Sequence, residues 1–158
     1  MTRAEADERH LRRAIELARL ARDHGNHPFG SLVVDPDGET VVEVENTVVT
    51  GRDWTGHAEL NAVRAAADVL GLRALGGYTL YASTEPCAMC TAAAYWAGVG
   101  RIVYALGAER FHEVARVHDG PGKLALPCRD VVARGGRTME VAGPHLEEEA
   151  AAVHDGFW

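Results

Sequence analysis

The chain has 158 residues, a length typical of one domain with its own hydrophobic core, and we expect a single domain over residues 1–158. No apolar run approaches the length of a membrane-spanning helix, and the charged N-terminus lacks the apolar segment of a secretory signal peptide. The net charge of −7 makes the chain a poor electrostatic match for nucleic acid.

Residues 2–24 have the pattern of an amphipathic helix. Apolar residues recur at helical spacing, with arginines between them on what we interpret as a solvated face. Thr2 and Glu5 have the spacing of a capping box, and Gly25 ends the helical pattern. We therefore predict a surface helix at the start of the domain.

Residues 30–49 predict a β-hairpin. An apolar strand over residues 31–35 and a returning strand over residues 40–49 flank the turn sequence Asp-Pro-Asp-Gly. Asn46 lies near the end of the second strand. From its position, it is either a simple turn former or a side chain that presents an amide to a ligand.

The remainder of the chain alternates helices and strands, with one long polar segment among them. Residues 107–127 are expected to form an irregular loop with a helical turn at 108–115, and long loops in compact domains are often functional. Strands joined through helices run parallel, so the pattern predicts a three-layer α/β domain with a mixed five-stranded sheet. We predict the further helices over residues 57–70, 87–97, 130–134 and 144–154 and the further strands over residues 78–83, 101–106 and 137–141.

Two short motifs point to the chemistry of this chain. Residues 57–59 read His-Ala-Glu, and residues 86–90 read Pro-Cys-Ala-Met-Cys. Together they form H-x-E followed by P-C-x-x-C, which is the signature of zinc deaminases that act on nucleobases. The two cysteines are three residues apart, so they lie on one face at the start of a helix, where the thiolate form is favoured.

The residue types in these motifs suit a catalytic zinc ion. Zinc binds imidazole nitrogen and thiolate sulfur in a tetrahedral shell, and a catalytic zinc keeps one position open for water. His57, Cys87 and Cys90 supply three such ligands, so Zn²⁺ is the expected cofactor. Glu59 is not needed as a ligand and is predicted to be the catalytic residue that moves protons. A structural zinc site, a redox pair and a chance match are the alternatives, but a structural zinc takes a fourth protein ligand.

Cys128 is the remaining cysteine, and no second C-x-x-C motif lies near it. It is therefore expected to be an inert buried thiol rather than part of a zinc site. With two cysteines committed to metal, no disulfide partner is left for the third. This favours a reducing compartment and predicts a cytoplasmic protein.

The order of the elements and the two motifs resemble the cytidine-deaminase-like superfamily. Within it, the chain is most similar to bacterial guanine deaminases, and next to tRNA adenosine deaminases. The resemblance covers nearly the whole chain and is strongest over residues 28–104. It implies a cytidine-deaminase-like fold, a bound zinc ion and a homodimer. The alanine-rich segment 87–97 and the aromatic C-terminus are the surfaces that we expect to meet a partner copy.

The resemblance also implies which side chains contact the substrate. Asn46 matches the asparagine that hydrogen-bonds the base, and Phe29 belongs to a Pro-Phe-Gly segment that forms the pocket wall. Trp96 lies in a Tyr-Trp-Ala sequence like that of guanine deaminases, where the tryptophan lines the pocket, although a buried tryptophan is more often part of a core. Asp119 is the nearest match to a pair of acidic residues in those enzymes, and Trp158 to an aromatic residue that closes their pocket.

The expected reaction is hydrolytic deamination of a free nucleobase or nucleoside, with a guanine-type purine favoured and ammonia released. The alternatives are a tRNA adenosine deaminase, a deaminase of cytosine-type or triazine bases, and an inactive zinc-binding scaffold. The intact Glu59 argues against a scaffold. The predicted final helix carries glutamates at 147–149 and no lysine or arginine, which argues against tRNA. We therefore expect a small-molecule partner, and no nucleic acid or membrane.

Overall fold

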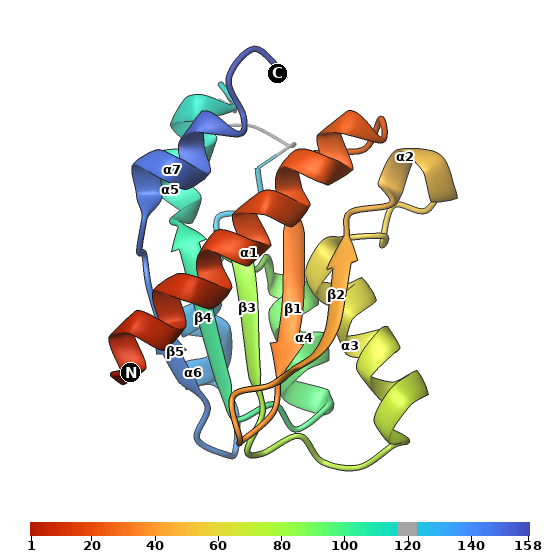
Figure 1. The fold of residues 1–158 in the computed structure, drawn as a ribbon, viewed down its shortest axis with the longest axis vertical. Helices are drawn as coiled ribbons and strands as arrows, with labels where there is room; N and C mark the ends of the chain where they lie inside the picture. The colour runs from red at the N-terminus through yellow and green to blue at the C-terminus, as the bar shows by residue number, and fades with distance from the viewer. Residues whose placement is uncertain (117–122) are drawn as a thin grey trace.

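The computed structural model describes residues 1–116 and 123–158 and shows a five-stranded sheet between two layers of helices (Figure 1). The strands are β1 (Gly30–Val34), β2 (Thr40–Glu45), β3 (Thr79–Thr84), β4 (Arg101–Leu106) and β5 (Glu140–Ala142). Their order in the sheet is β2-β1-β3-β4-β5. β1 is antiparallel to both of its neighbours, and β3, β4 and β5 run parallel to one another. The predicted α/β domain with a mixed five-stranded sheet is confirmed.

Different helices cover the two faces of the sheet. Because successive strand residues point to opposite faces, Leu32 and Val34 pack in one core and Val33 packs in the other. One face carries α1 (Arg3–Asp23), α5 (Ala108–Val114) and α7 (Glu147–Ala152), and the other carries α3 (Ala58–Leu70), α4 (Ala88–Trp96) and α6 (Cys128–Ala133).

No helix in the described part of the chain is both long and apolar enough to span a membrane.

The first helix begins and ends as its sequence predicts. The Thr2 hydroxyl accepts a hydrogen bond from the Glu5 backbone N–H at 3.2 Å, and the Thr2 N–H donates to the Glu5 carboxylate at 2.6 Å. This reciprocal pair is a capping box, as predicted. At the other end, Gly25 has a φ of +88°, a conformation that glycine adopts without the steric cost of a Cβ.

The second strand of the hairpin is shorter than predicted. It ends at Glu45, and a short helix that the sequence did not predict, α2 (Val48–Gly51), follows. The Asn46 Oδ1 accepts a hydrogen bond from the Val48 N–H at 3.0 Å, so this side chain turns the backbone away from the strand. The Asn61 amide of α3 donates to the Glu45 carbonyl at 2.9 Å and holds the turn against the helix.

The C-terminal third differs most from the sequence-based boundaries. The helical turn predicted at 108–115 is present as α5, but the helix predicted over 144–154 is reduced to α7. Leu146 precedes α7 with a φ of +55°, which is outside the helical region and delays the start of the helix. The fifth strand is present but begins later than the predicted 137–141, because Glu140 is the first residue to pair with β4.

Candidate active site

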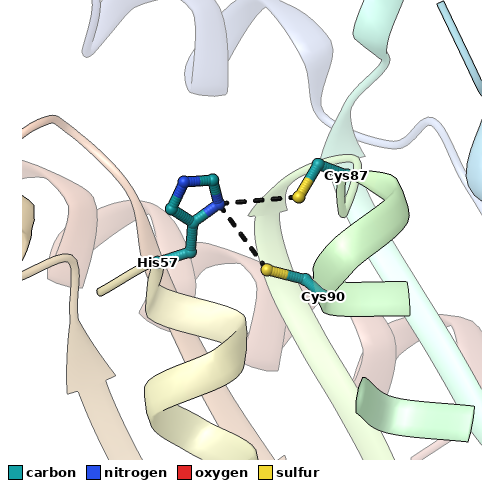
Figure 2. Close-up of side chains that lie close together, drawn as sticks. All are labelled: His57, Cys87 and Cys90. Atoms are coloured by element: carbon teal, nitrogen blue, oxygen red, sulfur yellow. Dashed lines mark hydrogen bonds between the residues drawn. The ribbon is translucent and has the colours of Figure 1, made fainter. Parts of the chain in front are cut away.

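His57, Cys87 and Cys90 meet where two helices begin, at one edge of the sheet (Figure 2). His57 is the N-cap of α3, Cys87 is the N-cap of α4, and Cys90 lies in the first turn of α4. The His57 Nδ1 is 3.6 Å from the Sγ atoms of both cysteines. Zn–S and Zn–N bonds of about 2.3 and 2.0 Å at tetrahedral angles would separate such ligand atoms by about 3.5 Å. The three side chains therefore have the spacing of a zinc site.

The electrostatics of this group suit a cation. A hydrogen bond from the Cys90 thiol lowers the pKa of Cys87 to about 4, against the opposing effect of burial. The same contact, together with burial, raises the pKa of Cys90. The hydrogen bond to Cys87 raises the pKa of His57. One thiolate with a second sulfur and an imidazole beside it is a donor set that zinc prefers, and among the described residues these are the three that gather as a metal-binding group.

Glu59 lies in the first turn of α3, directly beside the metal-binding group. Its side chain lines a cavity although only 5% of the residue is exposed. Burial raises the pKa of its carboxyl to about 7. A carboxyl group of this kind can both accept and release a proton near neutral pH, as a general acid–base residue must.

A cavity of about 420 Å³ opens next to these side chains, which is within the size range of small-molecule sites. Phe29 and Asn46 form one part of its lining. Residues 84–87, at the end of β3, form a second part. The remaining wall comes from α5 and from residues 123–127. The cavity therefore combines segments that are far apart in the sequence.

Asn46 is the polar residue best placed to orient a ligand among those predicted from the sequence. It is almost fully buried and lines the cavity. Its Oδ1 accepts the hydrogen bond from the Val48 backbone, so its amide nitrogen is the atom left to donate to a ligand. The two readings of Asn46 left open by the sequence are compatible, because the same side chain forms the turn and faces the cavity.

The aromatic residues at the C-terminus support the cavity wall from behind. Phe29 lines the cavity, and its ring centroid is 6.2 Å from that of Trp158. Trp158 also packs edge-on against Phe111, another lining residue, at 5.8 Å. The Trp158 Nε1 donates to the His154 Nδ1 at 3.1 Å. Trp158 is not itself among the lining residues, so within one chain it contacts the wall rather than the cavity.

Trp96 does not lie at the cavity within one chain, contrary to the prediction that it lines the pocket. It is 82% exposed, and its ring packs against that of Tyr95, at 5.4 Å. The physical reason is the direction of α4. Nine residues of helix at about 1.5 Å each carry Trp96 about 13 Å away from Cys87. Asp119 lies outside the described residues.

Two residues next to the motif were not predicted to take part in the site. Thr84 and Glu85 both line the cavity. The Glu85 carboxylate accepts one hydrogen bond from the Ala108 N–H at 2.9 Å and one from the Cys128 N–H at 3.0 Å. Both residues stand directly before the Pro-Cys sequence, but only the folded chain shows which groups they meet. Cys128 itself is fully buried, as predicted, and burial raises the pKa of its thiol to about 12.

Comparison with known proteins identifies the family. Residues 4–106 match the family model described as the cytidine and deoxycytidylate deaminase zinc-binding region. The chain belongs to this family. It is therefore a zinc-dependent deaminase with the cytidine-deaminase-like fold, as the sequence motifs predict.

Individual relatives of this deaminase differ in the base that their names specify. A probable cytosine deaminase of Schizosaccharomyces pombe is 38% identical over 155 residues, covering 98% of this chain and 94% of the relative. The guanine deaminase of Bacillus subtilis is 44% identical over 96 residues, covering 60% of this chain and 61% of the relative. The structure of a guanine deaminase from Nitrosomonas europaea superposes with a TM-score of 0.75 at 26% identity, covering 92% of this chain and 80% of that one.

Proposed function

We propose that this deaminase hydrolyses the exocyclic amine of a free nucleobase or nucleoside, with a guanine-type purine as the favoured substrate. The products are the corresponding keto base and ammonia. The observation that supports this most directly is the position of the buried Glu59 carboxyl, which lines the cavity beside His57, Cys87 and Cys90. That combination is suited to attack by water on a bound ring.

His57, Cys87 and Cys90 hold the zinc ion in this proposal. Their donor atoms, one nitrogen and two sulfurs, fit zinc, and a tetrahedral shell leaves one position for water. When bound, zinc supplies a Lewis acid that makes water nucleophilic at neutral pH. Cys87 and Cys90 are positioned for this role by the first turn of α4, and His57 by the start of α3.

Glu59 transfers the protons of the reaction. It accepts a proton from the attacking water as the new C–O bond forms at the ring carbon that bears the amine. It delivers this proton to the ring nitrogen and then moves the remaining proton of the added hydroxyl to the amine, so that the keto C=O forms, the C–N bond breaks and ammonia departs. Burial raises the pKa of this carboxyl, which favours the uptake of a proton from water.

Asn46 and Phe29 bind the ring. The Asn46 amide nitrogen donates to a polar atom of the base, and the Phe29 ring packs against the heterocycle. A guanine-type purine is favoured because guanine deaminases occur among both the sequence relatives and the structural neighbours. A cytosine-type base is the second candidate, because the cytosine deaminase relative aligns over nearly the full length of both chains.

A small-molecule substrate also fits the charge of the chain better than tRNA does. The net charge is −7, whereas nucleic-acid binding depends on contacts between phosphates and basic side chains. In α7, Glu149 forms a salt bridge with Arg12 at 3.3 Å, and Glu147 accepts from the Gly107 N–H at 3.1 Å. These glutamates serve the fold and leave no basic strip on the helix. The cytoplasm is the proposed compartment, because the cysteine content favours a reducing environment.

The assembly that we propose is a homodimer. The outer side of α4 exposes Trp96 and, one-third exposed, Met89, with alanines between them. Exposed apolar side chains on one helix are typical of a surface that meets another protein. A second copy of the chain is the occupant that the family resemblance favours.

The decisive test of the proposed reaction is ammonia release from a panel of substrates. The panel contains guanine, adenine, cytosine, triazines, the matching nucleosides and a tRNA anticodon stem-loop. We expect the highest kcat/KM with guanine and a turnover lowered by about 10²–10⁴-fold in the Glu59→Ala variant, which controls for contaminating deaminases. Efficient turnover of the stem-loop, with none of any small base or nucleoside, would contradict the proposal.

A further inference from the structure

Thr84 is the last residue of β3, and its hydroxyl is exceptional. Only 4% of the residue is exposed. In the part of the chain that the structure describes, Thr84 Oγ1 is the single buried side-chain polar atom without a hydrogen-bond partner. The residue lines the cavity beside the metal-binding group. A hydroxyl in this position is held away from water and has no hydrogen-bond partner among the described residues, in a residue that borders the cavity.

Other buried hydroxyls in the same region are paired. The Ser31 hydroxyl donates to the Tyr81 carbonyl at 2.7 Å, and the Ser83 hydroxyl accepts from the Gly30 N–H at 3.1 Å. The Thr91 hydroxyl donates to the Cys87 carbonyl at 2.9 Å. The fold therefore satisfies the hydroxyls that support the sheet and the helix, and leaves unpaired the one that borders the cavity.

Thr84 lies in a row with Phe29 and Asn46, the two predicted ring contacts, at one end of neighbouring strands. The antiparallel register that pairs Ser31 with Ala82 brings Phe29 and Thr84 to the same edge of the sheet. On the other side of Phe29, the Asn46 N–H donates to the Phe29 carbonyl at 3.0 Å. Phe29 thus stands between an amide and a hydroxyl. A flat ring that packs on Phe29 can meet a polar group on each side.

We propose that the Thr84 hydroxyl is a specificity-determining contact that hydrogen-bonds a polar atom of the substrate ring, on the side away from Asn46. This inference rests on the proposed function, because it requires a heteroaromatic base in the cavity. A hydroxyl both donates and accepts, so it can pair with a ring nitrogen or with a ring N–H. Two polar contacts on different sides of a flat ring fix its orientation relative to Glu59, which one contact does not.

The test compares Thr84→Val, which keeps the shape and removes the hydroxyl, with Thr84→Ser, which keeps the hydroxyl. We expect Thr84→Val to lower kcat/KM for the best base by about tenfold, which corresponds to about 1.4 kcal/mol. We expect the melting temperature of the substrate-free protein to stay the same or rise, because no hydrogen bond is lost. Thr84→Ser should stay within about threefold of the unaltered protein.

The matched control is Ser31→Ala, because the Ser31 hydroxyl is also buried but is paired and does not line the cavity. It should lower the melting temperature and leave kcat/KM unchanged. If Thr84→Val does not fold, Thr84→Ala removes the same hydroxyl and takes its place. An unchanged kcat/KM for the valine variant overturns the proposal. The proposal is also overturned if Thr84→Val lowers both the melting temperature and the activity and Thr84→Ser does the same, since that result indicates a structural role.

The proposed function can fail separately from this inference. Absence of turnover by the unaltered, zinc-loaded protein on every small base and nucleoside would reject the function itself, and with it the role of Thr84. Turnover by the unaltered protein with no effect of Thr84→Val would reject only the role of Thr84. The two failures therefore give different results in the same set of assays.

Discussion

The carboxylate of Glu85 accepts a hydrogen bond from the backbone N–H of Cys128 at 3.0 Å, across 43 residues of chain. Its other oxygen accepts from the Ala108 N–H at 2.9 Å. One side chain therefore holds the starts of both α5 and α6, beside the segments that form a wall of the cavity. Because Glu85 stands two residues before Cys87, the same carboxylate links that wall to the metal-binding helix.

Replacing Glu85 by alanine should raise KM by about tenfold or more and lower kcat less. Two backbone N–H groups lose their acceptor, and each unpaired buried group costs about 1–3 kcal/mol, so the wall shifts. Glu85→Gln keeps one acceptor oxygen and should fall between alanine and the unaltered protein. Steady-state kinetics at equal zinc content will measure the effect. An alanine variant with unaltered KM would show that the wall does not depend on Glu85.

Replacing Cys87 by alanine should abolish tight zinc binding, because two ligands do not hold the ion as three do. The unaltered protein should contain one zinc ion per chain. Metal analysis of purified protein will measure both. Cys128→Ala is the matched control, since Cys128 is a buried thiol outside the metal-binding group and should keep full zinc. Full zinc content in Cys87→Ala would reject this ligand.

Replacing Glu59 by alanine should lower kcat by about 10²–10⁴-fold, which is the typical contribution of a general acid–base residue. Zinc content and melting temperature should change little, because Glu59 is not proposed as a ligand. Turnover and metal content are to be measured on the same preparation. Turnover within tenfold of the unaltered protein would be incompatible with the proposed proton transfers.

The ion pair between Asp7 and Arg101 should make stability depend on acid pH. Burial acts to raise the pKa of Asp7, but hydrogen bonds from Arg101 at 2.6 and 2.7 Å and from Tyr81 at 2.7 Å outweigh it and lower that pKa. A carboxyl with a lowered folded-state pKa stabilises the fold above its unfolded value of about 3.9. This contribution is lost as the pH falls through the folded-state pKa.

Asp7→Asn tests this linkage. It should lower the free energy of unfolding by about 2 kcal/mol at pH 7, because the largely buried Arg101 loses one of its two carboxylate partners and keeps the other, Glu140. When the pH is lowered from 5 to 2 in steps of about half a unit, the free energy of unfolding should fall less for the variant than for the unaltered protein. Chemical denaturation at each pH measures both values. Parallel pH curves for the two proteins would exclude a contribution from Asp7.

Replacing Trp96 by glutamate should convert the proposed dimer into a monomer. A charge on the exposed apolar side of α4 would have to be desolvated in the interface. Light scattering at micromolar concentration should give twice the 17.0 kDa chain mass for the unaltered protein and 17.0 kDa for the variant. Leu72→Glu introduces the same charge at a fully exposed residue beyond α3 and should remain dimeric. A monomeric unaltered protein would reject the dimer.

The sequence by itself determined the local features of this protein. The capping box at Thr2 and the hairpin follow from residues close together in the chain, and the structure contains both. The motifs around His57 and Cys87 are local in the same way, because the start of a helix determines how side chains a few residues apart lie relative to one another. These motifs were also sufficient to predict the family and its zinc ion.

The tertiary structure alone decided the features that depend on distant partners. The sequence did not reveal that Glu85 binds the N–H groups of Ala108 and Cys128, since these meet only when three elements pack together. The sequence also did not show that Trp96 lies away from the cavity of a single chain, because that depends on the direction and length of α4 in the fold. The unpaired hydroxyl of Thr84 was also invisible, because whether a buried polar group finds a partner depends on the neighbouring strands and not on its own residue type.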